Sequence, residues 1–305
     1  MNRNLNWPTP TLGGTQFWTD FRNRNGYRLQ QNSQTSHWRL IDPSDVRLAW
    51  GAKQACLEAL KDAQPTAALG PANPKQATIV LLHGLMRSRK SMLPIQKALL
   101  AEGNEKTILF SYASTRRSID DHALALKELL EDLPTTERFS FSAHSMGNIV
   151  VRRLLNALEA NDPKGLLKRF DAMVMLGPPN QGAAIARILA PTGIFGMVTG
   201  TGGLQLGRDW EELERSLATP EFPFAIIAGD VDGKALRNPL IEPNNDLVVT
   251  VAEATLEGYE QFHRLPVLHT FMMNDKKVQQ LTVDFLMRKQ PARDRTVKRT
   301  ETPND

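Results

Sequence analysis

The sequence predicts an α/β protein in which a mostly parallel central sheet is covered by helices on both faces. From residue 77 onward, short apolar segments alternate with amphipathic segments of helical spacing, as they do in strand–helix–strand units. The apolar segments are hydrophobic almost throughout, as expected of parallel strands that are buried on both faces. The predicted strands span 77–82, 106–111, 138–143, 172–176 and 223–228, and the predicted helices span 89–101, 118–131, 146–160 and 275–288.

The composition is that of a globular protein. The chain has 305 residues, of which 41% are hydrophobic and 23% are charged, so it is too apolar to be disordered as a whole. This length suits one large domain or two ordinary ones. The single cysteine, Cys56, excludes an internal disulfide and a cysteine-rich metal cluster.

The formal net charge of +4 belongs to the two ends of the chain. Residues 288–305 carry six Lys or Arg and three Asp or Glu, and residues 1–28 carry four Arg and one Asp. Each end therefore contributes +3, which leaves −2 for residues 29–287. A protein that reads nucleic acid is expected to carry its basic surface on the folded body. We therefore expect no nucleic-acid partner and, at most, peripheral contact of the basic tail with a membrane.

Residues 1–76 are expected to form an N-terminal extension that packs on the main domain. Its aromatic side chains are expected to dock it there rather than to stack on nucleic-acid bases; they are Phe17, Trp18, Phe21, Trp38 and Trp50. The expected parts are an irregular segment at 1–25, a candidate β-hairpin of 27–31 with 36–41, a helix over 45–61 that starts at Asp42-Pro43-Ser44, and a linker at 64–76.

Two further expectations concern the tail and the location of the protein. Residues 289–305 are polar and basic, and we expect them to be a disordered tail. The N-terminus lacks the apolar core of a signal peptide, and no 18-residue stretch is apolar enough to span a membrane. These observations favour a cytoplasmic location.

The predicted strand at 138–143 ends in a candidate nucleophile. Ala143-His144-Ser145-Met146-Gly147 matches the pattern G-x-S-x-G with alanine in the first position, and a predicted helix follows at once. Such a turn holds the serine in a strained conformation and needs small residues two positions before and after it. The helix N-terminus favours the negative charge that develops during attack on a carbonyl. The context therefore favours a catalytic Ser145 over an ordinary turn.

The first predicted strand ends in a candidate oxyanion loop, His83-Gly84-Leu85-Met86. Acyl transfer needs two backbone N–H groups that bind the oxyanion. One comes from the residue after the nucleophile, here Met146, and the other from the loop after an early strand, here Leu85. Gly84 permits a close backbone approach, and His83 is expected to order the loop.

Three motifs together resemble those of a known family. They are the Ala-His-Ser-Met-Gly turn, L-G-P-P-N-Q-G-A at 176–183 and N-D-L-V-V at 245–249. The second is similar to the T-P-N-x-G-S segment that opens the lid region, and the third to the N-D-G-x-V acid loop, of lipases. Through these motifs the chain from about 77 to 288 resembles the α/β-hydrolase superfamily, closest to its triacylglycerol-lipase-like and GPI-inositol-deacylase-like serine esterases. It departs from the family motifs at Gly177, where threonine is usual, and at Leu247, where glycine is usual.

The resemblance implies an α/β-hydrolase fold with a lid inserted into the catalytic domain. The candidate lid is 183–215, which combines Ala, Ile, Leu, Phe and Met with several glycines. A mobile apolar flap there would cover an acyl chain and exclude water. The alternative is an apolar cap that is packed shut over the core.

The family order Ser…Asp…His implies that the histidine base comes late in the chain. His269 is favoured because it follows a short predicted last strand at 265–268 and precedes the final helix; His263 is the alternative. The acid of the family fixes the tautomer of the imidazole.

Two positions compete for this acid. Asp246 is favoured by its N-D-x-V-V context. The alternatives follow the predicted strand at 223–228, where other α/β-hydrolases carry the acid; they are Asp230 first and Asp232 second.

These observations predict a serine hydrolase that cleaves carboxylic esters through an acyl-enzyme, with no metal and no organic cofactor. Ser145 would attack the ester carbonyl, His269 would take and return the proton, and Asp246 would orient the imidazole. The expected substrate is a small acyl ester or a lipid. Two alternatives stay open, an acyltransferase that uses the same triad and a catalytically silent binding protein with a hydrolase fold.

Overall fold

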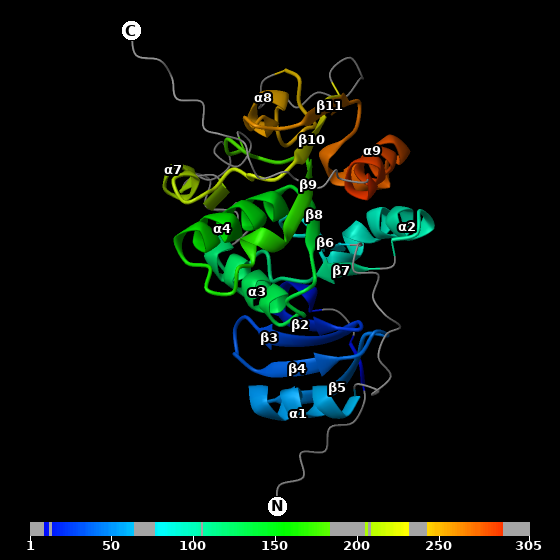
Figure 1. The fold of residues 1–305 in the computed structure, drawn as a ribbon, viewed down its shortest axis with the longest axis vertical. Helices are drawn as coiled ribbons and strands as arrows, with labels where there is room; N and C mark the ends of the chain where they lie inside the picture. Colours follow the sequence, from blue (N-terminus) through cyan, green and yellow to red (C-terminus); the bar gives the residue numbers. More distant parts are fainter. Residues whose placement is uncertain are drawn as a thin grey trace, which may run out of the picture.

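Six parallel strands form the central sheet of the computed structural model (Figure 1), as the alternating pattern predicts. The strand order is β11-β10-β9-β8-β6-β7. The chain runs from β6 to β7 on one side, then crosses to β8 on the other side of β6 and continues outward. Ligands of such sheets bind beyond the carboxyl ends of the strands where the winding direction changes, which here is between β6 and β8. The strands are β6 (Thr78–Leu82), β7 (Thr107–Phe110), β8 (Phe139–His144), β9 (Phe170–Leu176), β10 (Phe224–Gly229) and β11 (Gln261–Leu265).

The structure describes residues 9–11, 14–63, 77–104, 106–183, 205–206, 209–231 and 243–288. The predicted linker and the predicted tail lie outside these residues, and so does most of the candidate lid. Within the described ranges, no helix has both the length and the apolar character that crossing a membrane would require.

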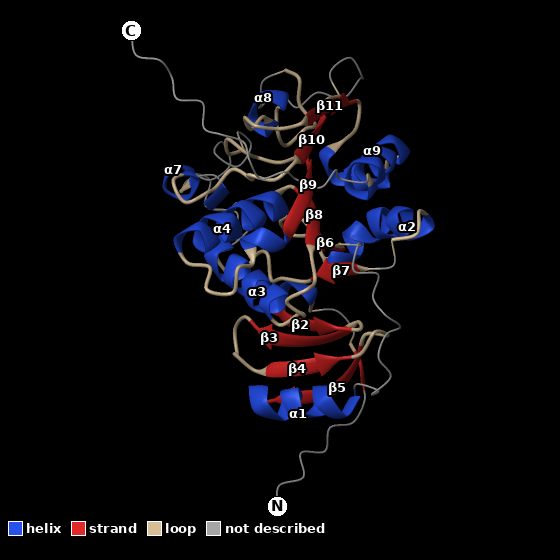
Figure 2. Cartoon of the chain, viewed as in Figure 1, coloured by secondary structure: helices blue, strands red, loops and turns tan. Residues whose placement is uncertain are grey.

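Helices cover both faces of the central sheet (Figure 2). α3 and α4 pack on one face, and α2 and α9 pack on the other. Because successive strand residues point to opposite faces, Val80 and Leu82 of β6 join the first core and Ile79 and Leu81 join the second. The helices around this sheet are η2 (Arg89–Met92), α2 (Leu93–Ala101), α3 (Ile119–Glu131), α4 (Met146–Ala160), η3 (Leu167–Arg169), α7 (Trp210–Glu214), α8 (Val251–Ala254), η5 (His269–Asn274) and α9 (Lys276–Met287).

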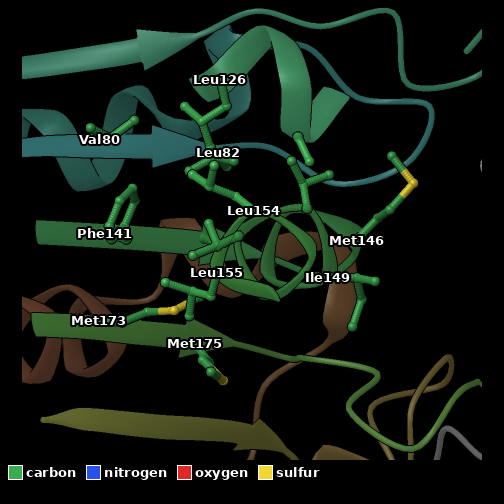
Figure 3. Close-up of a cluster of buried hydrophobic side chains, with 14 of the residues drawn as sticks. Val80, Leu82, Leu126, Phe141, Met146, Ile149, Leu154, Leu155, Met173 and Met175 are labelled. Carbon is green, nitrogen blue, oxygen red and sulfur yellow. The ribbon is translucent and has the colours of Figure 1, made fainter. Parts of the chain in front are cut away.

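The larger core lies between the sheet and the pair α3 and α4 (Figure 3). Leu126 of α3 and Leu154 of α4 belong to the same fully buried cluster as Leu82 and Phe141 of the sheet. Burying one such side chain contributes about 1.5–3 kcal/mol. This packing fixes α4, the helix that begins directly after Ser145, against the ends of β6 and β8.

The last strand ends earlier than the sequence predicts. β11 closes at Leu265, whereas 265–268 is the predicted strand. Pro266 has no N–H group for a ladder hydrogen bond, and the Val267 N–H donates to the Leu265 carbonyl oxygen over 2.8 Å. The chain therefore turns at Leu265 into the loop that leads to His269.

The described residues up to Ala63 form a second, antiparallel sheet of five strands with one helix (Figure 1). The strand order is β1-β5-β4-β3-β2. β3 and β4 pair where the hairpin is predicted, with Leu29 opposite Leu40, and α1 packs on this face through Cys56 and Leu60. The elements are β1 (Thr9–Pro10), η1 (Thr15–Phe17), β2 (Trp18–Arg24), β3 (Tyr27–Asn32), β4 (Trp38–Ile41), β5 (Val46–Gly51) and α1 (Lys53–Ala63).

Two expectations for this extension are wrong. Trp18–Arg24, expected to be irregular, forms β2, and Val46–Gly51, expected to begin a helix, forms β5. Asp42 closes a turn instead of starting a helix, because its Oδ1 accepts the N–H groups of Ser44 (2.9 Å) and Val46 (2.8 Å). The helix therefore begins only at α1, after β5 has paired with β4.

The extension contacts the central domain through β2. The Asp20 N–H donates to the Ser111 carbonyl oxygen (2.8 Å), and the Ser111 N–H donates to Oδ2 of Asp20 (2.8 Å). Oδ1 of Asp20 accepts from Nε2 of Gln30 (2.6 Å). Asp20 is fully buried, and burial raises the pKa of its carboxyl group. Ser111 directly follows β7, so this pair of hydrogen bonds joins the two sheets.

We expect Asp20→Ala to destabilise the protein by about 1–3 kcal/mol, because the buried Ser111 N–H loses its acceptor. Urea unfolding followed by circular dichroism measures this change. Asp62→Ala removes an exposed carboxylate of α1 and, as the control, should leave the midpoint nearly unchanged. Equal midpoints for both variants would show that the fold does not depend on this contact.

Candidate active site

Ser145 occupies the turn between β8 and α4. Its backbone has φ 52° and ψ −124°, a conformation that residues other than glycine rarely adopt. The Ser145 N–H donates to the Leu176 carbonyl oxygen (2.9 Å), and Asn148 donates both its N–H (3.0 Å) and its side-chain amide (2.9 Å) to the Ser145 carbonyl oxygen. These bonds hold the turn from both sides and place the serine at the N-terminus of a 15-residue helix.

Glycines allow β6 to approach this turn. A Cβ atom at Gly147 would lie 2.8 Å from the His83 carbonyl oxygen and 2.9 Å from Cβ of Leu82. A Cβ atom at Gly84 would lie 2.9 Å from Nδ1 of His144 and 3.0 Å from Cβ of Ser145. Non-bonded carbon contacts are optimal at about 3.5–4.0 Å. Both glycines are therefore required by the close packing of the oxyanion loop on the turn.

His269 and Asp246 form a buried hydrogen-bonded pair. Nδ1 of His269 lies 2.7 Å from Oδ2 of Asp246, and the His269 N–H donates to the Asp246 carbonyl oxygen (3.1 Å). An ionised carboxylate only accepts hydrogen bonds, so the proton of this bond lies on Nδ1. With the proton on Nδ1, Nε2 of an uncharged ring is an acceptor, which is the form that a general base requires.

The loop around Asp246 fixes its carboxylate. Oδ1 accepts the N–H groups of Val248 (3.0 Å) and Val249 (2.7 Å). Oδ1 of Asn245 accepts the Leu247 N–H (2.8 Å). Leu247 has a φ of 80°, a conformation that favours glycine. Leu247 therefore adopts this backbone conformation at a position where the similar N-D-G-x-V loops usually have glycine.

The alternative residues make other contacts. Asp230 directly follows β10, but its carboxylate is paired with the Arg264 guanidinium of β11. Nε2 of His263 lies 3.1 Å from Oε1 of Gln261 on the same strand. Among the residues described, the carboxylate that hydrogen-bonds His269 is that of Asp246; Asp232 lies outside them.

Two more glycines make room for the acid–histidine pair, and the sequence analysis did not assign them to the site. Gly177, with φ 52°, directly follows β9, and a Cβ atom there would lie 3.1 Å from Nδ1 of His269 and 3.3 Å from Oδ2 of Asp246. A Cβ atom at Gly229, the last residue of β10, would lie 2.5 Å from the Val267 carbonyl oxygen and 2.6 Å from Cβ of Asp246. Glycine at the carboxyl end of a buried strand is the sequence signal that marks both.

His144 connects the Ser145 turn with His269. The ring centroids of His144 and His269 are 4.7 Å apart, and Nε2 of His144 lies 3.0 Å from the His269 carbonyl oxygen. Nε2–H of His144 donates to that carbonyl, and burial holds the pKa of His144 well below its usual value. In the described structure Ser145 Oγ makes no hydrogen bond to His269; in sites without substrate this contact is often long.

The N-terminal extension braces the candidate oxyanion loop after β6. Nε2 of Gln16 donates to the Arg87 carbonyl oxygen (2.6 Å), and Oε1 of Gln16 accepts from Oγ of Ser114 (3.0 Å). Oγ of Ser114 in turn accepts the Met86 N–H (3.1 Å). One side chain of the extension therefore fixes both the loop after β6 and the loop after β7.

In the part of the chain that the structure describes, neither proposed oxyanion donor gives its N–H to another acceptor. The Leu85 N–H donates no hydrogen bond within the described ranges, and Met146 is the first residue of α4, so its N–H has no acceptor inside the helix. His83 orders this loop: its Nδ1 lies 2.8 Å from the Gly84 carbonyl oxygen and its ring stacks on Tyr112 at 4.1 Å. Burial lowers the pKa of His83 to about 4, so the ring is neutral at pH 7.

No protein-family model and no curated protein sequence matches the chain. The structure is similar to that of the lipase BlEst2 from Bacillus licheniformis. The match to its mature form has a TM-score of 0.52 at 15% sequence identity and covers 70% of this chain and 92% of that chain. The match to its propeptide form has a TM-score of 0.53 at 15% identity and covers 73% of this chain and 52% of that chain. This chain has the α/β-hydrolase fold.

The α/β-hydrolase fold explains why the predicted site residues gather at one edge of the sheet. The oxyanion loop follows β6, Ser145 follows β8 and Gly177 follows β9. Asp246 lies between β10 and β11, and His269 follows β11. Because all six strands are parallel, all their carboxyl ends meet at this edge. In the same described residues, no group of three or more His, Cys, Asp or Glu side chains is placed to hold a metal ion.

We expect Gly177→Ala to reduce activity more than its effect on stability explains. Its control is Gly165→Ala, because Gly165 also has a positive φ (64°) but has open space around it. Both variants should lose roughly 1 kcal/mol of stability through the unfavourable φ. Only Gly177→Ala crowds His269 and Asp246, so only it should lower kcat measured with a p-nitrophenyl ester as the test substrate. Equal kcat values for the two variants would contradict this role of Gly177.

Proposed function

We propose that this chain is a serine hydrolase that cleaves carboxylic esters through an acyl-enzyme. The observation that carries the proposal is the 2.7 Å hydrogen bond between His269 and Asp246, made at the sheet edge where Ser145 occupies a strained strand-to-helix turn. The similarity in fold to a lipase supports an ester as the substrate.

The proposed acylation step uses these three side chains in sequence. Oγ of Ser145 attacks the ester carbonyl carbon, and its proton passes to Nε2 of His269. Asp246 stabilises the imidazolium that forms, through the bond to Nδ1. The N–H groups of Leu85 and Met146 bind the oxyanion. The proton then passes from Nε2 to the leaving oxygen as the C–O bond breaks, which releases the alcohol.

The deacylation step repeats this chemistry with water. His269 takes a proton from the water as it attacks the acyl carbonyl carbon. The proton returns to Oγ of Ser145 when the carboxylic acid leaves. The proposal involves neither a metal nor an organic cofactor.

Two exposed apolar side chains beside the candidate site favour a substrate with an apolar acyl group. Met86 follows the proposed donor Leu85 and is 52% exposed, and Phe271 lies two residues after His269 and is 57% exposed. Their loops are joined by a hydrogen bond from the Arg87 guanidinium to the Thr270 carbonyl oxygen (3.4 Å). Large apolar side chains exposed beside a polar site are typical of surfaces that bind apolar ligands.

We expect Ser145→Ala to lower kcat for p-nitrophenyl esters by at least about 10⁴-fold, since it removes the nucleophile. Ser142→Ala is the matched control, because the Ser142 hydroxyl is buried on β8 and makes no hydrogen bond within the described structure. It should retain activity. A fluorophosphonate probe should label the wild type and Ser142→Ala but not Ser145→Ala. Full turnover by Ser145→Ala would rule out the proposed nucleophile, and an unlabelled wild type would favour a silent binding protein.

We expect Asp246→Asn to lower kcat by about 10³–10⁴-fold, because an amide cannot enforce the tautomer that leaves Nε2 of the histidine free to accept a proton. Asp230→Asn removes the other candidate carboxylate, which pairs with Arg264, and should leave kcat within a few-fold of the wild-type value. Steady-state kinetics on one ester measures both. The reverse order of effects would make Asp230 the acid.

A further inference from the structure

A row of side chains crosses the N-terminal sheet on the face opposite α1. Asp20, Gln30, Arg39 and Trp50 are aligned with one another on β2, β3, β4 and β5, so they project from the same face. Nε2 of Gln30 donates to Oδ1 of Asp20 (2.6 Å), and Nε of Arg39 donates to Oε1 of Gln30 (2.8 Å). A neutral amide therefore separates the buried guanidinium from the buried carboxylate.

Arg39 is buried, and no carboxylate of the described residues pairs with it. It is 9% exposed and its guanidinium carbon lies 3.9 Å from the centroid of the Trp18 ring. Burial, and then the charge of Arg28, lowers the pKa of Arg39 to about 9. Asp45, the other carboxylate on this side, is bound by Arg28, by Arg89 (2.7 Å) and by Lys90 (3.7 Å).

The two arginines of this face lack carboxylate partners among the described residues. Among the residues described, neither Arg39 nor Arg47 forms an ion pair. The residues before Thr78 that the structure leaves out contain no Asp or Glu. A desolvated guanidinium without a carboxylate is costly, so this position favours the binding of an external anion.

A cavity lies at this guanidinium. Its volume is about 290 Å³, and Arg39, Arg47, Trp18 and Trp50 all line it. The guanidinium carbon of Arg47 lies 5.5 Å from the centroid of the Trp50 ring, and Trp50 is 46% exposed. Two arginines and an accessible aromatic surface therefore meet in a space the size of a small organic molecule.

We propose that this cavity binds a small organic anion, with its carboxylate or phosphate group on Arg39 and Arg47 and its apolar part against Trp50. Guanidinium groups suit this ligand because their planar fork donates paired hydrogen bonds to either oxyanion. The two arginines come from the paired strands β4 and β5 and both line the cavity in the ligand-free structure. The site is separate from the proposed esterase centre and does not depend on it.

Isothermal titration calorimetry of the full chain with four probes tests this proposal. The probes are inorganic phosphate, phenyl phosphate, acetate and benzoate. We expect an aromatic anion to bind more tightly than the inorganic or aliphatic anion of the same charge group, because only the aromatic anion can also contact Trp50. Comparing the affinities for phenyl phosphate and benzoate shows whether the cavity prefers a phosphate or a carboxylate group. Tighter binding of either one supports the proposed anion site.

Three variants locate the binding. Arg47→Gln should weaken the best probe by at least about tenfold, since it removes a charged hydrogen-bond donor. Arg215→Gln removes the same charge from an exposed position after α7 and should leave the affinity unchanged. Trp50→Ala, at an exposed position, should weaken the aromatic probes but not inorganic phosphate. The proposal fails if no probe binds the wild type at millimolar concentration, or if folded Arg47→Gln binds as tightly as the wild type.

Discussion

The close contact between the end of β6 and the turn at Ser145 is the constraint on which the rest of the candidate site depends. The missing side chains of Gly84 and Gly147 allow it, because a Cβ atom at either would lie within 2.9 Å of a neighbouring atom. The contact places the N–H of Leu85 near the proposed nucleophile and fixes the first turn of α4. A residue with the φ of Ser145 is stable only where the surrounding packing determines its position, and here a fully buried core on both sides of the turn does so.

The acid–histidine pair is held by the same physical means on the neighbouring strands. Gly177 and Gly229 let Asp246 and His269 approach the ends of β9 and β10 more closely than any side chain would permit. The candidate site is thus built by close approach of backbones, and hydrogen bonds from backbone N–H groups then aim the carboxylate. Such an arrangement leaves little freedom for the imidazole ring, which is what preorganised catalysis requires.

The central sheet and the serine turn could be predicted from sequence because their signals are local: apolar strands, and small residues around one serine. The choice of acid is less local, since the N-D-x-V-V context favours Asp246 but Asp230 also follows the same buried strand. What separates them is Arg264, a partner 34 residues away from Asp230. Val46–Gly51 was expected to be helical because its apolar residues fit helical spacing as well as alternation. Val46–Gly51 is a strand because it pairs with β4. This contact is between distant segments, so the local sequence pattern does not encode it.

The single amide of Gln16 has a wider consequence for how this protein is divided into parts. It binds Arg87 and Ser114 at once, so the loop that carries the proposed oxyanion donor takes part of its support from the N-terminal extension. The extension and the hydrolase fold therefore share contacts at the edge of the candidate site. In domain exchange, the two sheets would have to move together to keep this contact. Local opening of the N-terminal sheet would loosen the loop after β6.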